Sequence, residues 1–263
     1  MAEERQQTDL GTETPIAENE QVRALLALLK EKDSPAYADF AELIESVTGM
    51  EKRLSIAVGE LATMREDLQK MQDHSLKASL QKTCKTLEGN ISSMQQKLSE
   101  LKGKIVAGCR HILADFKERG TVALNGITHF LHLKPALEAI RQGAENHQQA
   151  SSRAMERIDA FASEYHEAGK HLKNMRLALM GKEPVQQAKT GGEIAHYAKA
   201  PYRASRACMG AMKKNAEKAM AALEKLEQAA ERRPSVLESM REQAAKLEPA
   251  KNQPAPSHDK GSR

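Results

Sequence analysis

The sequence predicts an all-α protein: an elongated coiled-coil helical hairpin plus further long helices, with disordered N- and C-terminal tails. Its 263 residues include only four Phe, four Tyr and no Trp. Large aromatic rings usually dominate the core of a thick mixed fold, so their scarcity argues against such a fold. Ala, Leu, Met, Glu, Lys, Gln and Arg fill most other positions, and these residues are strong helix formers. Apolar residues also recur at alternating steps of four and three, which is the heptad period of paired helices.

The first elements follow from cap-forming residues. Residues 1–18 are acidic and have no apolar period, so a disordered tail is expected there. Asn19 is expected to cap a short helix at the start of a long-helix coiled-coil region over 19–180. The sequence Asp33-Ser34-Pro35 ends that helix, with Ser34 as the N-cap of the next helix and Pro35 at its first position.

Two heptad seams occupy the next part of this region. Each alternates steps of four and three, the spacing at which helices wrap around a partner. The first seam comprises Leu43, Val47, Met50, Leu54, Ala57, Leu61, Met64, Leu68 and Met71. The second comprises Leu80, Cys84, Leu87, Ile91, Met94, Leu98, Leu101 and Ile105, and continues after a stutter through Cys109, Ile112 and Phe116.

The two seams do not share one register. Extending the first would bury Lys82 and Lys85 without partners, which is costly, so the phase breaks between residues 72 and 79. A helical hairpin over about 35–118 lets the seams bury each other, whereas a single continuous helix that dimerises along its length is the alternative. Cap-forming residues at the break favour the hairpin.

The remaining elements complete the prediction. Gly120 is expected to stop the hairpin, and further helices are expected over about 121–180, the longest starting at Pro135. Its distal half carries a third seam of Ile158, Phe161, Tyr165, Ala168, Leu172, Met175 and Leu179. A Gly- and Pro-containing linker follows at 181–193, then a basic helical segment at 194–247 and a disordered tail at 248–263. Within the basic segment, Pro201 is expected to interrupt or start one helix and Pro234 to begin a short last one.

No motif points to catalysis, a cofactor or a metal. His129 and His132 lack accompanying ligands, and His166 and His171 are five residues apart, so their rings diverge by about 140°. Signatures of phosphate-binding loops, nucleophile elbows and Cys-x-x-Cys sites are missing. We therefore expect a protein that is not an enzyme and has no small-molecule substrate.

The composition also bears on the cellular compartment of the protein. No apolar run approaches the ~20 residues of a membrane-spanning helix, and the acidic start lacks the features of a secretory signal. The three cysteines lie inside helical patterns, which is typical of reduced thiols in the cytoplasm. The net charge of +4 neither implies nor excludes nucleic-acid binding.

One stretch of the sequence is unusually basic. No acidic residue occurs between Glu193 and Glu217. The cations of this stretch and its immediate continuation are Lys199, Arg203, Arg206, Lys213, Lys214 and Lys218. Such a helix face binds nucleic-acid phosphates, an anionic membrane or an acidic protein groove, or it is a solvated face of the chain's own bundle.

Four longer stretches of the sequence can be compared with known families: ENEQVRALLALL (18–29), GMEKRLSIAVGELATMREDL (49–68), EYHEAGKHLKNMRLALMGKEPV (164–185) and APYRASRACMGAMKKNAEKA (200–219). They resemble an uncharacterised helical family encoded on conjugative transposons and integrative elements of Gram-positive gut bacteria. The resemblance implies a mobile-element context in a bacterial cytoplasm and modestly favours DNA-linked roles. It carries over no catalytic residue.

These observations favour a non-enzymatic scaffold or adaptor that docks partners along its coiled-coil surfaces, through a protein partner or self-association. The seams themselves are either the chain's own core or docking surfaces, and their Met and Ala content favours adaptable packing. The alternative function is an accessory nucleic-acid-binding protein that uses the basic face at 199–218.

Overall fold

A computed structural model describes residues 14–70, 74–125, 130, 132–180, 182–186 and 193–247. Within these residues the chain forms helices and no strand, which confirms the all-α prediction. The helices are α1 (Glu20–Glu31), α2 (Ala36–Lys70), α3 (His74–Arg119), α4 (Lys134–Leu179) and α5 (Glu193–Leu247), with 3-10 segments η1 (Ile16–Glu18) and η2 (Gly120–Asn125). The tails predicted before residue 14 and after residue 247 lie outside the described residues.

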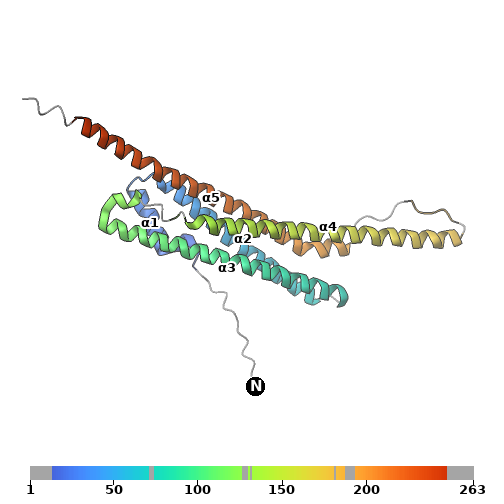
Figure 1. Cartoon of the computed structure of the whole chain (residues 1–263). Helices are drawn as coiled ribbons and strands as arrows, with labels where there is room; N and C mark the ends of the chain where they lie inside the picture. The colour runs from blue at the N-terminus through green and yellow to red at the C-terminus, as the bar shows by residue number, and fades with distance from the viewer. Residues whose placement is uncertain are drawn as a thin grey trace, which may run out of the picture.

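Helices α2 and α3 form the predicted hairpin and lie side by side (Figure 1). Arg65 near the end of α2 pairs with Glu88 near the start of α3 at 3.3 Å, and Glu51 pairs with Lys102 at 2.6 Å. The earlier residue of α2, Glu51, pairs with the later residue of α3, Lys102, so the two helices are antiparallel. The hairpin is therefore confirmed over the continuous helix.

The first two seams are the core of this hairpin. From Leu43 to Ile112 their members are at most 7% exposed, apart from the half-buried Met64. Phe116 at the far end is also half-buried, and Met71 lies outside the described residues. The apolar stripe of each helix is thus covered within the chain, so these two seams present no docking surface.

Helix α5 completes an antiparallel four-helix bundle by packing against both α2 and α4. Lys225 of α5 reaches Glu42 of α2 at 3.0 Å, and Lys213 reaches Glu145 of α4 at 3.0 Å. Between residues 208 and 226 the apolar face of α5 is buried in the bundle. Its innermost members are Met209, Met212, Ala216, Ala219 and Ala222.

The prediction of helix breaks at Pro201 and Pro234 is wrong, because α5 runs through both residues without interruption. A proline removes one backbone hydrogen bond, to the carbonyl four residues earlier. At Pro201 that carbonyl belongs to Tyr197, a residue that is 64% exposed. Packing of α5 on α2 and α4 supports a helix that continues through this first proline.

The bundle is closed at the end where α2 begins and α3 stops. There the rings of Phe40 and Phe130 stack with centroids 5.1 Å apart. Leu25 and Leu29 of α1 and Ile112 of α3 are buried in the same cluster. Gly120 ends α3 with a φ of +63°, as its position after a basic turn predicted.

Two expectations for the N-terminal helices differ in outcome. The Asn19 side chain accepts hydrogen bonds from the amides of Gln21 (3.1 Å) and Val22 (3.4 Å), which confirms the N-cap. Ser34 does not cap α2 with its side chain, because its hydroxyl is buried without a hydrogen-bond partner. Its backbone carbonyl instead accepts from the Tyr37 amide at 3.0 Å, and α2 begins at Ala36.

Residues 14–18 are structured and do not belong to a disordered tail, which corrects that boundary. Ile16 is fully buried, and its amide donates to the Glu51 carboxylate at 3.2 and 3.3 Å. Lys102 pairs with the same carboxylate at 2.6 Å and donates to the Thr14 carbonyl at 3.2 Å. We call Thr14, Ile16, Glu51 and Lys102 the N-terminal clasp. A single apolar residue has no period, so no sequence signal marked it.

Candidate functional site

Helix α4 extends past the ends of the other helices (Figure 1). Lys199 of α5 pairs with Asp159 of α4, and the antiparallel register set by Lys213 and Glu145 continues through this pair. In that register the first residue of α5, Glu193, lies beside about residue 165. We call residues 161–179 the α4 tip, most of which lies beyond the start of α5.

The α4 tip carries the third predicted seam, and this seam is exposed. Phe161 is 72% exposed, Tyr165 70% and Leu179 86%. Leu172 and Met175, between them, are 64% and 62% exposed. We call Phe161, Tyr165, Ala168, Leu172, Met175 and Leu179 the exposed seam. The spacing that buries the first two seams therefore leaves the third in solvent.

The exposed seam continues the buried face of α4. The fully buried Leu137, Ile140 and Ala144 lie on the same heptad stripe farther back along the helix. Ile158, one step before the exposed seam, is half-buried. The same heptad stripe, in which His147 and Ser151 interrupt the apolar residues, thus passes from the core of the bundle into solvent.

The chain's own linker runs along another side of the tip. The Asn174 amide donates to the Val185 carbonyl at 3.0 Å, and its side-chain oxygen accepts from the Val185 amide at 2.7 Å. At about 100° per residue, Asn174 points about 160° away from Leu172. The described linker residues 182–186 therefore lie away from the exposed seam and do not cover it.

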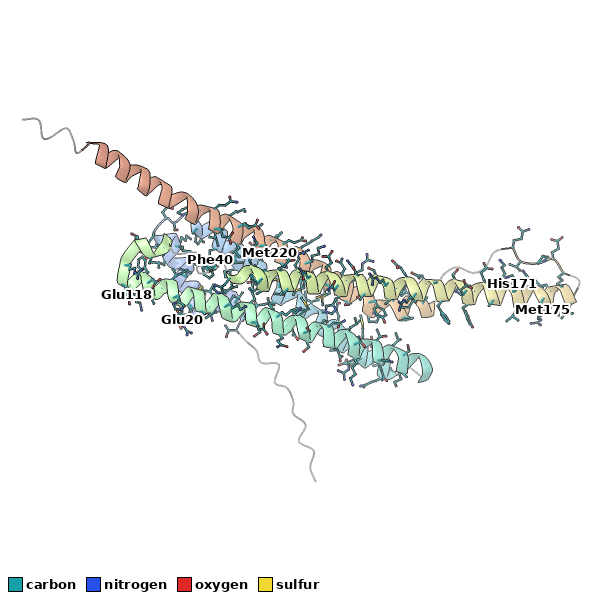
Figure 2. The ribbon with its side chains drawn as sticks, viewed as in Figure 1. Glu20, Phe40, Glu118, His171, Met175 and Met220 are labelled. Carbon is teal, nitrogen blue, oxygen red and sulfur yellow. The ribbon has the colours of Figure 1, made fainter. Side chains whose placement is uncertain are left out.

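The apolar area left in solvent is large. At roughly 200 Å² for each large side chain, the exposed fractions of the five large members correspond to about 700 Å². Monomeric proteins rarely expose contiguous apolar patches beyond a few hundred Å². Phe161 and Tyr165 stack on each other with centroids 6.5 Å apart, so part of the patch is a preformed aromatic surface. Figure 2 shows Met175 near the free end of α4, far from Phe40 at the closed end of the bundle.

Polar groups on the remaining faces keep the tip helical and hydrated. Lys170 pairs with Glu167 at 2.9 Å, one helical turn away, and this hydrogen bond lowers the pKa of the Glu167 carboxyl. His171 lies 4.0 Å from the same carboxylate. Such pairs stabilise an exposed helix modestly, so the tip has local support for its helical form.

A second candidate surface is an open groove of about 1340 Å³ between α4 and α5. Its cationic lining consists of Arg53, Lys199, Arg203, Arg206, Lys213 and Lys214, which we call the basic groove. Five of these are members of the predicted stripe, whereas Lys218 does not line the groove. Glu156, Asp159 and Glu217 also line it, so acidic groups interrupt the positive surface.

Several of the predicted cations are already paired within the chain. Lys199 bonds Asp159, and Lys213 bonds Glu145 at 3.0 Å, so both tie α5 to α4. Arg203 donates to the backbone carbonyl of His196 at 2.9 Å. The side chains of Arg53, Arg206 and Lys214 have no ion-pair or hydrogen-bond partner among the described residues, so these three cations of the groove remain available to an anion. Arg206 and Lys214 are the two that belong to the predicted stripe.

The described side chains offer little for catalysis. No group of three or more His, Cys, Asp or Glu in this part of the chain is placed to hold a metal ion. Burial raises the pKa of Cys109 to about 12 and that of Cys208 to about 11, and Cys84 is also raised by burial. These thiols are protonated at neutral pH and are poor nucleophiles.

None of the described helices combines the length and apolarity that crossing a membrane requires. Residues 18–263 match a protein family that is described as a "Family of unknown function (DUF6674)". Searches among curated proteins and solved structures found no match. The family match covers nearly the whole chain and agrees with the resemblance to an uncharacterised family. The chain belongs to this DUF6674 family.

Proposed function

We propose that this protein is a non-enzymatic helical scaffold or adaptor that docks a partner protein through the exposed seam of the α4 tip. The observation that carries the proposal is the contrast between seams of identical spacing, two of them buried and the third 62–86% exposed at its large residues. A heptad stripe is stable in water when another helix covers it. The surface therefore suits an amphipathic helix laid along it.

The rest of the molecule supports this role by holding the tip away from the bundle. The closed end and the N-terminal clasp fix the hairpin, and ion pairs fix α5 against α4. The tip is a preformed helix continuous with the bundle, which lowers the entropic cost of docking. With the sequence resemblance, we place this scaffold in the cytoplasm of a bacterium, in the context of a mobile element.

Site-specific photo-crosslinking in cells that naturally produce the protein tests the proposal. A photoreactive phenylalanine replaces Tyr165 on the seam or, as the matched control, the exposed Ser163 about 160° away around the helix. We expect protein adducts from position 165, few from position 163, and loss of the former with Leu172→Glu. Equal adduct yields from the two positions, or none from either, would refute docking at the seam.

The basic groove supports a second candidate function, nucleic-acid binding. The specific observation is that Arg206 and Lys214 line an open groove without a carboxylate partner in the described residues. Phosphates of a nucleic-acid backbone would pair with both cations and release counterions. The internal pairing of Lys199 and Lys213 makes this the weaker candidate, because it removes two cations from the surface.

Binding of a DNA duplex at several salt concentrations tests this alternative. We expect Arg206→Gln with Lys214→Gln to weaken binding and to reduce the salt slope by about 0.9 for each lost phosphate contact. Lys218→Gln is the matched control, since Lys218 is exposed outside the groove. Unchanged DNA mobility with excess protein at low salt would eliminate this function.

A further inference from the structure

We infer that the partner at the exposed seam is a second copy of this chain, whose α4 tip packs antiparallel against the first. The inference rests on the proposed function and names its partner. It follows from three features of the molecule. They are the composition of the chain's terminal segments, the position of the bundle relative to the exposed seam, and the complementarity of the seam residues of two antiparallel copies.

The chain's terminal segments do not carry a stripe that fits the seam. Residues 248–263 contain no Leu, Ile, Val, Phe or Met, and residues 1–13 contain only Met1 and Leu10 of these types. A heptad partner needs a large apolar residue at nearly every third or fourth position. Neither of these two segments therefore supplies the covering helix, and we assign that helix to a second copy of the chain.

The position of the bundle determines the direction of that helix. Because the exposed seam continues the buried stripe of α4, the bundle lies on the seam side of α4 behind the tip. A parallel copy would have to place its own bundle in that same space. An antiparallel copy approaches from the free end of the tip, so the two bundles lie at opposite ends of the paired rods.

The length of the tip then sets the register. Each tip ends where the partner's bundle begins, so residues 161–179 of the two copies overlap fully. Phe161 lies opposite the partner's Leu179, Tyr165 opposite the partner's Met175, and Ala168 opposite the partner's Leu172. Each small or flexible residue thus meets a larger one, and a thioether meets an aromatic ring. Parallel pairing would instead oppose Ala168 to its own copy and leave a gap.

The area agrees with a specific interface. Each chain contributes about 700 Å² from the five large seam residues, compared with about 800 Å² per partner in a standard-size protein interface. An interface between identical surfaces related by a two-fold axis is also the commonest form of protein assembly. The surface of the exposed seam is therefore close in area to one side of a standard-size interface.

Sedimentation velocity of the full chain over a range of concentrations tests the assembly. The chain has a mass of 29.0 kDa, and we expect a reversible dimer. Leu172→Glu places a carboxylate in the apolar interface and should raise the dimer dissociation constant by at least about 100-fold. Lys173→Glu introduces the same side chain at the neighbouring exposed position and should leave the dimer intact. Circular dichroism verifies that both variants remain helical.

Disulfide trapping tests the direction. Phe161→Cys and Leu179→Cys, made in separate chains and mixed, should form a covalent dimer, because these positions lie opposite each other in the antiparallel pair. Either variant alone should not, since identical positions are 18 residues apart, about 27 Å along the helix. The native thiols Cys84, Cys109 and Cys208 are buried and do not interfere under native conditions.

Three results would overturn the inference. They are a monomer throughout the concentration series, a dimer that Leu172→Glu does not weaken, or a covalent dimer formed by Phe161→Cys alone. A monomer that still forms seam-dependent adducts with a different protein at position 165 would leave the scaffold function intact. The two proposals therefore fail separately.

Discussion

Two leucines on heptad stripes of long helices differ in burial, one in the core and one in solvent. Replacing each with alanine measures how much that burial contributes to the free energy of unfolding. Leu101 of α3 is 0% exposed, whereas Leu172 of the α4 tip is 64% exposed. Both substitutions remove the same atoms, and both put alanine, the best helix former, in a helix. Any large difference in the free energy of unfolding must therefore come from packing.

The magnitudes follow from burial. Leu101→Ala leaves a cavity among fully packed neighbours and should lower the free energy of unfolding by about 3–4 kcal/mol. Leu172 keeps only about a third of its side chain covered, and full burial of a leucine contributes about 2 kcal/mol. Leu172→Ala should therefore cost less than about 1 kcal/mol in the isolated chain, and higher helix propensity offsets a few tenths of that.

Urea unfolding followed by circular dichroism at 222 nm measures both values. The experiment is done at a protein concentration at which sedimentation shows monomers, because association adds stability to the folded state. Equal losses for Leu101→Ala and Leu172→Ala in the monomer would refute the assignment of the tip as uncovered. At higher concentration the penalty for Leu172→Ala should grow, while that for Leu101→Ala should not.

Three further expectations concern the bundle. Gly103→Ala should stabilise the chain by about 1 kcal/mol, because an added Cβ there meets no atom within 4 Å. Gly108→Ala should instead lower the melting temperature, because its Cβ would lie 2.7 Å from the Phe130 ring. The pKa of Cys109 rises from 9.0 to about 12 on folding, so the unfolded chain loses this proton first. The free energy of unfolding should therefore decline by up to about 1.4 kcal/mol per pH unit above pH 9, and Cys109→Ala should flatten this decline in denaturation at pH 8 and 10. Glu51→Gln should weaken the N-terminal clasp by about 1–2 kcal/mol. The loss should be measurable as faster hydrogen exchange at the buried Ile16 amide, which donates to the Glu51 carboxylate. Unchanged exchange there would show that the carboxylate charge does not hold the clasp.

Periodicity predicted most of the backbone because a heptad stripe specifies which face of a helix must be buried. The register change between residues 72 and 79 indicated two helices instead of one, and α2 and α3 are two helices that pack side by side with both seams buried in the bundle. Asn19 and Gly120 marked helix ends through local chemistry that needs no distant partner. Local signals were sufficient wherever the deciding interaction lies within a turn or two.

Long-range contacts decided the features that local signals missed. Pro201 lies inside a continuous helix because α2 and α4 hold the turns that follow it. Ile16 is ordered because Glu51, 35 positions later, accepts its amide hydrogen bond. Lys199 and Lys213 looked like free cations in a stretch without acids, but carboxylates of α4 lie against them.

The amino-acid sequence by itself determined that this protein consists of rods with apolar stripes, since helix propensity and heptad spacing are properties of short segments. Only the tertiary structure decided which stripe has a neighbour. Three seams share one spacing. Leu101 lies in the core of the bundle, whereas Leu172 is in water because α4 continues past the point where α5 begins beside it. That position is set by contacts between residues far apart in the chain, and it leaves the apolar stripe of the α4 tip exposed.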